Sequence, residues 1–544
     1  MSIRDCFFYL VIAVIFIFSQ NCLADNPIVQ TVFTADPAPM VYKDTVYCYT
    51  SHDDDVLVDN FFTMRNWALF STTDMVNWQS RGIVASLKNF SWAGSNGAWA
   101  AQCIPRDGKF YMYCPIHMKG IGVLVADDPA GPFTDPLKKP LLNNGNNDID
   151  PTVFIDDDDQ AYLYWGNPTC TYAKINNDMI SLMGSRTALN MTVESFGKRS
   201  NTERPTSYEE GPWLYKHNKL YYLAFAGGPI SEHLAYSTST SPTGPWKYGG
   251  IIMSTFSGGA FTNHPGIIDY KGNYYLFYHS QQLSNDGFKR SVCVEKFSYN
   301  ADGTISKISV TKDGAPQIGA LNPYDTIQAE TICYESGVET NPCSEGGIMV
   351  DSINNNDYIK VKGVDFSDGA KTFSARVASG ASGGKIELRL GSQTGKLVGT
   401  CEIQGTGGWD KWITKTCDVS DVTGKQDLFF KFTGSSGFLF NFNWWKFTPL
   451  KVGIDTESKN SAVDRYAISV NNKMVTFKPD YSSSAHTNTV IQLFSLSGKL
   501  FFSTIQKSQI PSIVTMDLRA MKSGSYLIKV VSDQSTMAKI INLY

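Results

Sequence analysis

Four residues that can donate or accept protons precede a proline by one or two positions. They lie in the sequences Asp36-Pro37, Asp150-Pro151, Glu210-Gly211-Pro212 and His264-Pro265. Hydrolysis of a glycosidic bond requires one carboxylic acid that stays protonated near neutral pH and one carboxylate that stays ionised. A third carboxylate nearby can raise the pKa of the acid by like-charge repulsion. Gathered in one place, these residues would therefore suit glycosidic bond cleavage.

An internal repeat indicates how the chain would gather them. A polar turn followed by an aromatic strand recurs five times, at DTVYCY, DGKFYMY, DDQAYLY, NKLYYLAF and GNYYLFY. The aligned tyrosines are Tyr47, Tyr111, Tyr162, Tyr222 and Tyr275, spaced 51 to 64 residues apart. A strand-rich repeat of this length is typical of propeller blades, so we predict a five-bladed β-propeller over residues 25–320.

The four residues share one position in this repeat. Counting back 11 or 12 residues from each tyrosine reaches Asp36, Ala100, Asp150, Glu210 and His264. Each short sequence by itself is also typical of a turn that enters a strand. Equivalent positions of successive blades surround one axis, however, so the shared register favours a catalytic site at one mouth of the propeller.

Composition limits the possible partners. The 544 residues carry a formal net charge of −4, and no basic tract interrupts them, which argues against a nucleic-acid partner. Their length suggests three or four domains. Aromatic residues make up 13% of the chain, which favours a carbohydrate or another stacking ligand, although a β-rich fold also enriches aromatics.

The ends of the chain suggest export. Residues 1–24 have an early arginine, a short apolar run and a small-residue cleavage site, as in a secretory signal peptide. The apolar run is too short to span a bilayer, so we expect no membrane span and a secreted or bacterial cell-surface protein.

Beyond the propeller, the pattern remains β-rich. Short strands between glycine turns predict a β-sandwich, of the jelly-roll kind, over residues 321–450. A polar linker follows at residues 451–465, and residues 466–544 predict a small C-terminal β-sandwich. The fold class expected from the sequence is therefore all-β.

Longer sequence phrases resemble glycoside hydrolase family 43. They are TADPAPMVY, IDPTVFIDDD, YEEGPWLYK and TNHPGIIDYKGNYYLFYH. That family consists of five-bladed propellers that invert configuration at the anomeric carbon. The resemblance implies that Asp36 is the general base, that Glu210 is the general acid, and that Asp150 modulates the pKa of the acid and orients it.

The resemblance also implies roles for neighbouring residues. His264 matches a histidine that commonly ligates a central calcium ion, mostly through water. Arg290 matches an arginine near the sugar pocket, with an ordinary surface ion pair as the alternative. Trp99 precedes the register position of the second blade, and it would either stack on a sugar or pack in the core.

Within the family, NWALFSTTDMVNW and the domain order are similar to arabinoxylan arabinofuranohydrolases. This likeness implies a monomer that removes α-L-arabinofuranosyl side chains from arabinoxylan or a related hemicellulose. Two alternatives stay open: an exo-acting β-xylosidase on xylo-oligosaccharides, and a non-catalytic polysaccharide-binding protein.

The second domain resembles a family 6 carbohydrate-binding module through QAE, GGWDKW and LFNFNWW. The resemblance implies that Gln328 and Glu330 help to hold a structural calcium ion, since oxygen ligands suit this cation. Trp409 and Asn441 would bind sugar at a loop edge. Tyr358 matches one aromatic of the family's clamp, but the tyrosine often found six residues earlier is Ser352 here.

The last 79 residues resemble the C-terminal sorting domain of type IX secretion through FSLSGKL and SGSYLIKV. The alternative is a second small sandwich of unknown role.

Overall fold

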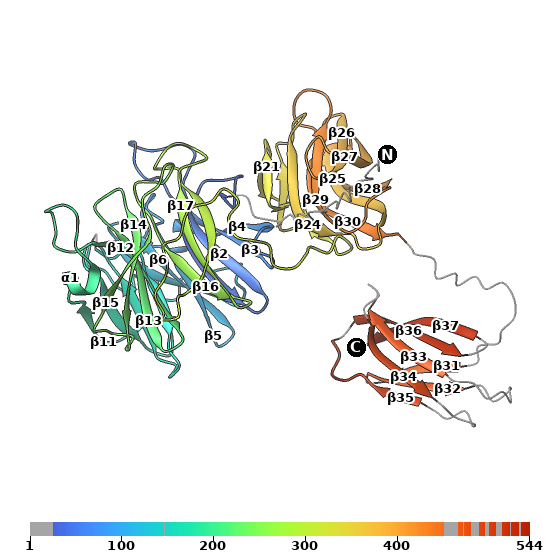
Figure 1. Cartoon of the computed structure of the whole chain (residues 1–544). Helices are drawn as coiled ribbons and strands as arrows, with labels where there is room; N and C mark the ends of the chain where they lie inside the picture. Colours follow the sequence, from blue (N-terminus) through green and yellow to red (C-terminus); the bar gives the residue numbers. More distant parts are fainter. Residues whose placement is uncertain are drawn as a thin grey trace, which may run out of the picture. The chain divides into compact units, whose positions relative to one another are not determined.

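The computed structural model divides into two units, residues 1–450 and residues 451–544, which are described separately (Figure 1). It describes residues 26–145, 147–450, 466–471, 473–479, 489–495, 500–506, 514–522, 524–532 and 535–543. The predicted signal peptide and the predicted linker lie outside these residues.

Five antiparallel sheets form the blades of a propeller, which confirms the prediction from the repeat. The first blade contains β1 (Thr34–Tyr42), β2 (Thr45–His52), β3 (Asn66–Thr72) and β4 (Trp78–Ser86), and the second contains β5 (Gln102–Arg106), β6 (Lys109–Ile116) and β7 (Gly120–Ala126). The third contains β8 (Thr152–Ile155), β9 (Ala161–Trp165), β10 (Thr171–Ile175) and β11 (Leu182–Ala188). The fourth contains β12 (Tyr208–His217), β13 (Leu220–Gly227), β14 (His233–Ser239) and β15 (Lys247–Met253), and the fifth contains β16 (Gly266–Tyr270), β17 (Asn273–Ser280) and β18 (Ser291–Phe297). Two short helices, the 3₁₀ turn Leu87–Asn89 and α1 (Val193–Phe196), lie in connections.

The first strand of each blade lies at the centre of the propeller. β1 contacts β5 and β16, β8 contacts β5 and β12, and β12 contacts β16, so these five strands close a ring. The segment before β1 completes the last blade, because Ile28 N donates to Val292 O at 2.9 Å and Thr34 N donates to Arg290 O at 2.8 Å. The residues that begin the central strands therefore face a common axis.

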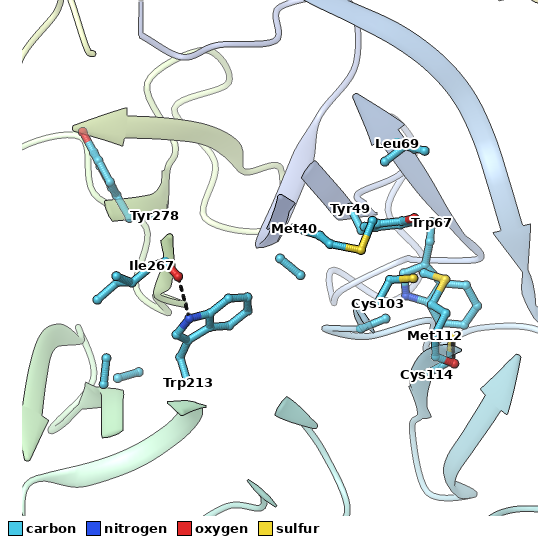
Figure 2. Close-up of a cluster of buried hydrophobic side chains, with 14 of the residues drawn as sticks. Met40, Tyr49, Trp67, Leu69, Cys103, Met112, Cys114, Trp213, Ile267 and Tyr278 are labelled. Carbon is cyan, nitrogen blue, oxygen red and sulfur yellow. Dashed lines mark hydrogen bonds between the residues drawn. The ribbon is translucent and has the colours of Figure 1, made fainter. Parts of the chain in front are cut away.

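Apolar side chains hold adjacent blades together. Met40 and Tyr49 of the first blade are buried in one cluster with Cys103 of the second (Figure 2). In the same view, the indole nitrogen of Trp213 on β12 donates to Ile267 O on β16 at 3.0 Å. This bond fixes the strand that carries Glu210 against the neighbouring blade.

The second domain is a sandwich of two sheets. One sheet contains β22 (Glu339–Pro342), β23 (Ile348–Asp351), β30 (Asn441–Pro449), β25 (Ala370–Ser379) and β28 (Gly408–Asp418), and β19 (Ile327–Gln328) pairs with β30. The other contains β21 (Tyr334–Ser336), β24 (Tyr358–Asp365), β29 (Lys425–Thr433), β26 (Gly383–Leu390) and β27 (Lys396–Gln404). The short strand β20 (Thr331–Ile332) instead pairs with β4, which extends the first blade of the propeller.

The C-terminal unit also consists of two sheets. They contain β31 (Tyr466–Asn471), β32 (Met474–Pro479) and β35 (Val514–Asp517), and β34 (Leu500–Gln506), β33 (Thr489–Ser495), β36 (Gly524–Ser532) and β37 (Ser535–Leu543). Val475, Ile491 and Ile528 are buried in its core. The all-β fold class is thus confirmed. Among the described residues, no helix is long and apolar enough to cross a bilayer.

Candidate active site

Asp36 and Glu210 lie at irregular points of the central strands β1 and β12, and Asp150 lies two residues before β8. The β1–β2 register shifts between Ala35 and Ala38, and the β12–β13 register shifts on both sides of Glu210. Bulges of this kind turn a side chain away from the regular alternation of a strand. Asp36 and Asp150 also have φ angles of 51° and 55°, a costly conformation for residues other than glycine. The backbone strain at Asp36 and Asp150 is therefore associated with the direction of these side chains.

Asp36 is held in its ionised form by an arginine. Arg290 Nη1 donates to Asp36 Oδ1 at 2.9 Å, and the backbone N of Asp36 donates to His279 Nδ1 at 3.1 Å. Burial alone would raise the pKa of Asp36, but the charge of Arg290 and smaller effects of His279 and His264 bring it below the usual value. An ionised carboxylate at this position suits a general base.

A second carboxylate fixes the arginine. Arg290 is 3% exposed, and its Nε and Nη2 donate to Asp53 at 3.0 and 2.9 Å. The guanidinium also lies over the ring of Phe62, 4.5 Å from its centroid. The alternative of a surface ion pair at Arg290 is therefore wrong, because burial and two carboxylate partners place it beside Asp36.

Asp150 and Glu210 are close neighbours. The backbone N of Gly211 donates to Asp150 Oδ2 at 2.9 Å. Burial and the charge of Glu210 raise the pKa of Asp150 well above its usual value. Burial also raises the pKa of Glu210 to about 7, although the amide of Asn167, which donates to Glu210 Oε2 at 2.6 Å, opposes the shift. The pair therefore retains a proton near neutral pH, as a general acid must.

The adjacent glutamate serves a different purpose. Glu209 is buried and forms ion pairs with Arg199 and Arg204. Its arginine partners differ from the partner of Glu210, which is the amide of Asn167. Its two arginine partners anchor the strand that presents the acid.

Comparisons with known proteins identify the family of the chain. Residues 24–305, which contain all three carboxylates, match glycosyl hydrolases family 43. The chain belongs to that family. Residues 328–449 match the carbohydrate binding module of family 6. The chain is thus a family 43 glycoside hydrolase that carries a family 6 module.

Two relatives of this family 43 enzyme cover most of its length. The arabinoxylan arabinofuranohydrolase of Bacillus subtilis (strain 168) is 36% identical over 488 residues, or 78% of this chain and 92% of the relative. The protein of the same name from Paenibacillus polymyxa is 33% identical over 543 residues, or 86% and 83% of the two chains. A crystal structure of a family 43 arabinoxylan arabinofuranohydrolase from Bacillus subtilis, in complex with cellotetraose, matches with a TM-score of 0.69 and 33% identity, covering 78% of this chain and 97% of that one.

The structure places His264 and Trp99 in different surroundings within the family 43 domain. His264 is buried beside Gly211, where a Cβ would lie 3.2 Å from its Nδ1, and burial lowers its pKa to about 4. Trp99 is half-buried and stacks on His117 with ring centroids 4.1 Å apart. The stacking supports the packing role of Trp99 and leaves its predicted contact with sugar a prediction.

The donors predicted for calcium are sparse in the structure. The described residues contain no group of three or more acidic, histidine or cysteine side chains suited to a metal ion. Glu330 is buried, accepts from Gln79 of the first blade at 3.1 Å, and has a pKa that burial raises to about 8. Gln328 pairs with Trp444 in β19. Glu330 and Gln328 alone supply fewer oxygen ligands than a hard cation binds, so the calcium site stays a prediction that needs further oxygen ligands.

The predicted sugar site of the family 6 module is partly assembled. Trp409 is 42% exposed, and its backbone oxygen accepts from the Asn441 side chain at 2.9 Å. Tyr358 lies in the other sheet, where its ring packs beside Tyr334 and Phe429. The structure therefore brings Trp409 and Asn441 together but places Tyr358 in the opposite layer.

Three polar residues of the carboxylate site were not predicted from the sequence: Asn167 contacts Glu210, His279 contacts Asp36, and Asp53 contacts Arg290. Asp53 follows β2 in a run of aspartates, Asn167 follows β9, and His279 is the second-last residue of β17. None of them occupies the repeated register, so no spacing indicated them. A search for polar residues at or just after the ends of the second strands would have found all three, because β2, β9 and β17 are the second strands of their blades.

Proposed function

We propose that this enzyme removes α-L-arabinofuranosyl side chains from arabinoxylan with inversion of configuration. The observation that carries the proposal is the different surroundings of two carboxylates: Arg290 Nη1 donates to Asp36 Oδ1 at 2.9 Å, whereas Glu210 Oε2 accepts from the neutral amide of Asn167 at 2.6 Å. Arg290 lowers the pKa of Asp36, while burial raises the pKa of Glu210 to about 7. The choice of substrate is supported by the two relatives, which bear the name arabinoxylan arabinofuranohydrolase and match most of the chain.

In this mechanism, each carboxylate has one task. Asp36, ionised beside Arg290, removes a proton from water as the water attacks the anomeric carbon. Glu210 gives its proton to the glycosidic oxygen, so that the xylosyl hydroxyl leaves neutral. Asp150, bonded to Gly211 N, fixes the peptide that follows the acid and repels its ionised form.

The test incubates the full chain with wheat arabinoxylan and, separately, with unbranched xylo-oligosaccharides, and identifies the released monosaccharide. We expect arabinose from the polymer, lost in Glu210→Gln and kept in Glu194→Gln, which changes an exposed glutamate of α1. Proton NMR of the first product should show the inverted anomer. Xylose from the oligosaccharides would indicate an exo-acting β-xylosidase, and binding without release of sugar would indicate a non-catalytic polysaccharide-binding protein.

We also propose that the enzyme is exported and works as a monomer. The signal-like residues 1–24 and the sorting-like pattern of residues 466–544 support export. Expression with and without residues 466–544 in a bacterium that has type IX secretion, followed by fractionation, tests the sorting role. Light scattering of the purified protein tests its oligomeric state.

A further inference from the structure

Two cysteines of the family 6 module lie on strands that meet at one edge of the sandwich. β28 is the last strand of one sheet and β27 is the last strand of the other, and the two strands contact each other (Figure 1). β27 contains Cys401, and β28 contains Cys417 together with Trp409. No ladder of hydrogen bonds joins the two sheets at this edge, so side chains must hold it closed.

A backbone hydrogen bond sets the alignment of the two strands. Ser420 N donates to Val398 O at 3.0 Å. The chain reverses direction between β27 and β28, so three residues forward from Val398 and three residues back from Ser420 lead to Cys401 and Cys417. The two cysteines are therefore expected to lie opposite each other. Opposite residues of adjacent strands have the Cα spacing of about 4.4 to 6.8 Å that a disulfide bond requires.

The two thiol groups interact directly. The thiol of Cys417 donates a hydrogen bond to Cys401, which lowers the pKa of Cys401 and raises the pKa of Cys417. Cys401 is buried in the apolar core of the module, and Cys417 packs against the same core but is partly exposed. A second close approach lies beside them, since a Cβ at Gly399 would lie 3.0 Å from Asp418 O. The sulfur atoms thus share one site that an oxidant can reach from the side of Cys417.

Three thiols of the propeller have different partners. Those of Cys48, Cys114 and Cys293 are buried and donate to backbone oxygens at 3.6 to 3.9 Å. A thiol with this partner has no second sulfur in its hydrogen bond. These cysteines therefore serve as internal controls for the pair in the module.

We infer that Cys401 and Cys417 form a disulfide bond that joins the two sheets of the family 6 module. The two thiols lose two protons and two electrons to a disulfide oxidant, which is reduced to two thiols. Cys417 attacks one sulfur of the oxidant and releases the first thiol, and Cys401 then attacks Cys417 Sγ and releases the second. The bond closes a loop of about 17 residues and secures the strand that carries Trp409. The module would thus reach full stability only in an oxidising compartment.

Peptide mapping tests the bond itself. The purified full chain is incubated with a mixture of oxidised and reduced glutathione, its free thiols are alkylated in urea, and it is digested with trypsin without reduction. We expect residues 397–411 and 416–425, which contain Cys401 and Cys417, to appear as one linked pair of peptides. The peptide with Cys114 should be alkylated. Alkylation of both module cysteines, or their linkage to any other cysteine, overturns the inference.

Thermal unfolding tests the stabilising effect of the bond. Complete reduction with a phosphine should lower the Tm of the first transition of the oxidised full chain by about 5 to 10 °C. In the double variant Cys401→Ala with Cys417→Ala, the same reductant should leave Tm unchanged, whereas in Cys114→Ala, a change of a buried propeller thiol, it should still lower Tm. An unchanged Tm in the wild-type protein, or an equal loss in the double variant, overturns the stabilising role of this bond.

Discussion

The hydrogen bond from Asn167 to Glu210 can be removed by substitution, which directly tests how the pKa of Glu210 is set. The amide donates to Glu210 Oε2 at 2.6 Å and therefore favours the ionised carboxylate. Its removal in Asn167→Ala should raise the pKa of Glu210 from its value of about 7. A hydrogen bond to a charged group contributes about 1.5 to 3 kcal/mol, and one pKa unit corresponds to about 1.4 kcal/mol. We expect an upward shift of at least about one unit.

The pH dependence of kcat/KM on 4-nitrophenyl α-L-arabinofuranoside reports the pKa values of the free enzyme. The alkaline limb, where Glu210 loses its proton, should move to higher pH in Asn167→Ala, while the acid limb, which belongs to Asp36, should stay. Asn177→Ala, in an exposed loop of the same blade, is the matched control. An alkaline limb that stays in place or moves to lower pH would show that Asn167 does not control the proton of Glu210.

Three further predictions test other parts of the chain. Arg290→Met should lower the free energy of unfolding by about 3 to 5 kcal/mol, because Asp36 and Asp53 lose their buried partner. Urea titration at pH 7 measures this change, and a loss below about 1 kcal/mol would contradict the prediction. Glu330→Gln should raise Tm more at pH 9 than at pH 5 in EDTA. The reason is that burial raises the pKa of Glu330 to about 8, so the native state loses stability as pH rises through that value. A Tm of the variant below that of the wild-type protein at pH 9 would refute this account. Trp409→Ala should weaken binding to arabinoxylan about tenfold in affinity electrophoresis, since an exposed ring is lost; unchanged mobility would exclude Trp409 from the sugar site.

The repeat predicted the propeller and its central residues because a blade is a local unit. Five turn-and-strand phrases indicated five blades, and one position in that register contained Asp36, Asp150 and Glu210. The bulges that turn Asp36 and Glu210 toward the axis leave no local signal, because they depend on pairing with the next strand.

Contacts between distant parts of the chain could not be predicted from the sequence. Asp53 and Arg290 are 237 residues apart, and neither lies in the register that located the carboxylates. Glu232 likewise lies in a loop, and only the folded chain brings it near Asn263. Such contacts are set by tertiary packing, so neither spacing nor periodicity records them.

The positions of these charges explain which carboxylate ionises first. Among the described residues of the site, Asp36, Asp53, Asp150 and Glu232 are buried and Glu210 is half-buried, and Arg290 is the arginine that contacts two of these carboxylates. Five negative charges around one positive charge would repel strongly in a site of low polarity.

The site resolves this conflict by position. Arg290 donates to Asp53 with two nitrogens, yet burial and, to a lesser degree, the charge of Asp36 keep the pKa of Asp53 above its usual value, whereas the charge of Arg290 brings the pKa of Asp36 below its usual value. On the far side, Asp150 and Glu210 lack such a cation at hydrogen-bond distance among the described residues and keep a proton between them. One buried arginine, placed nearer to Asp36 than to Glu210, thus separates the base from the acid.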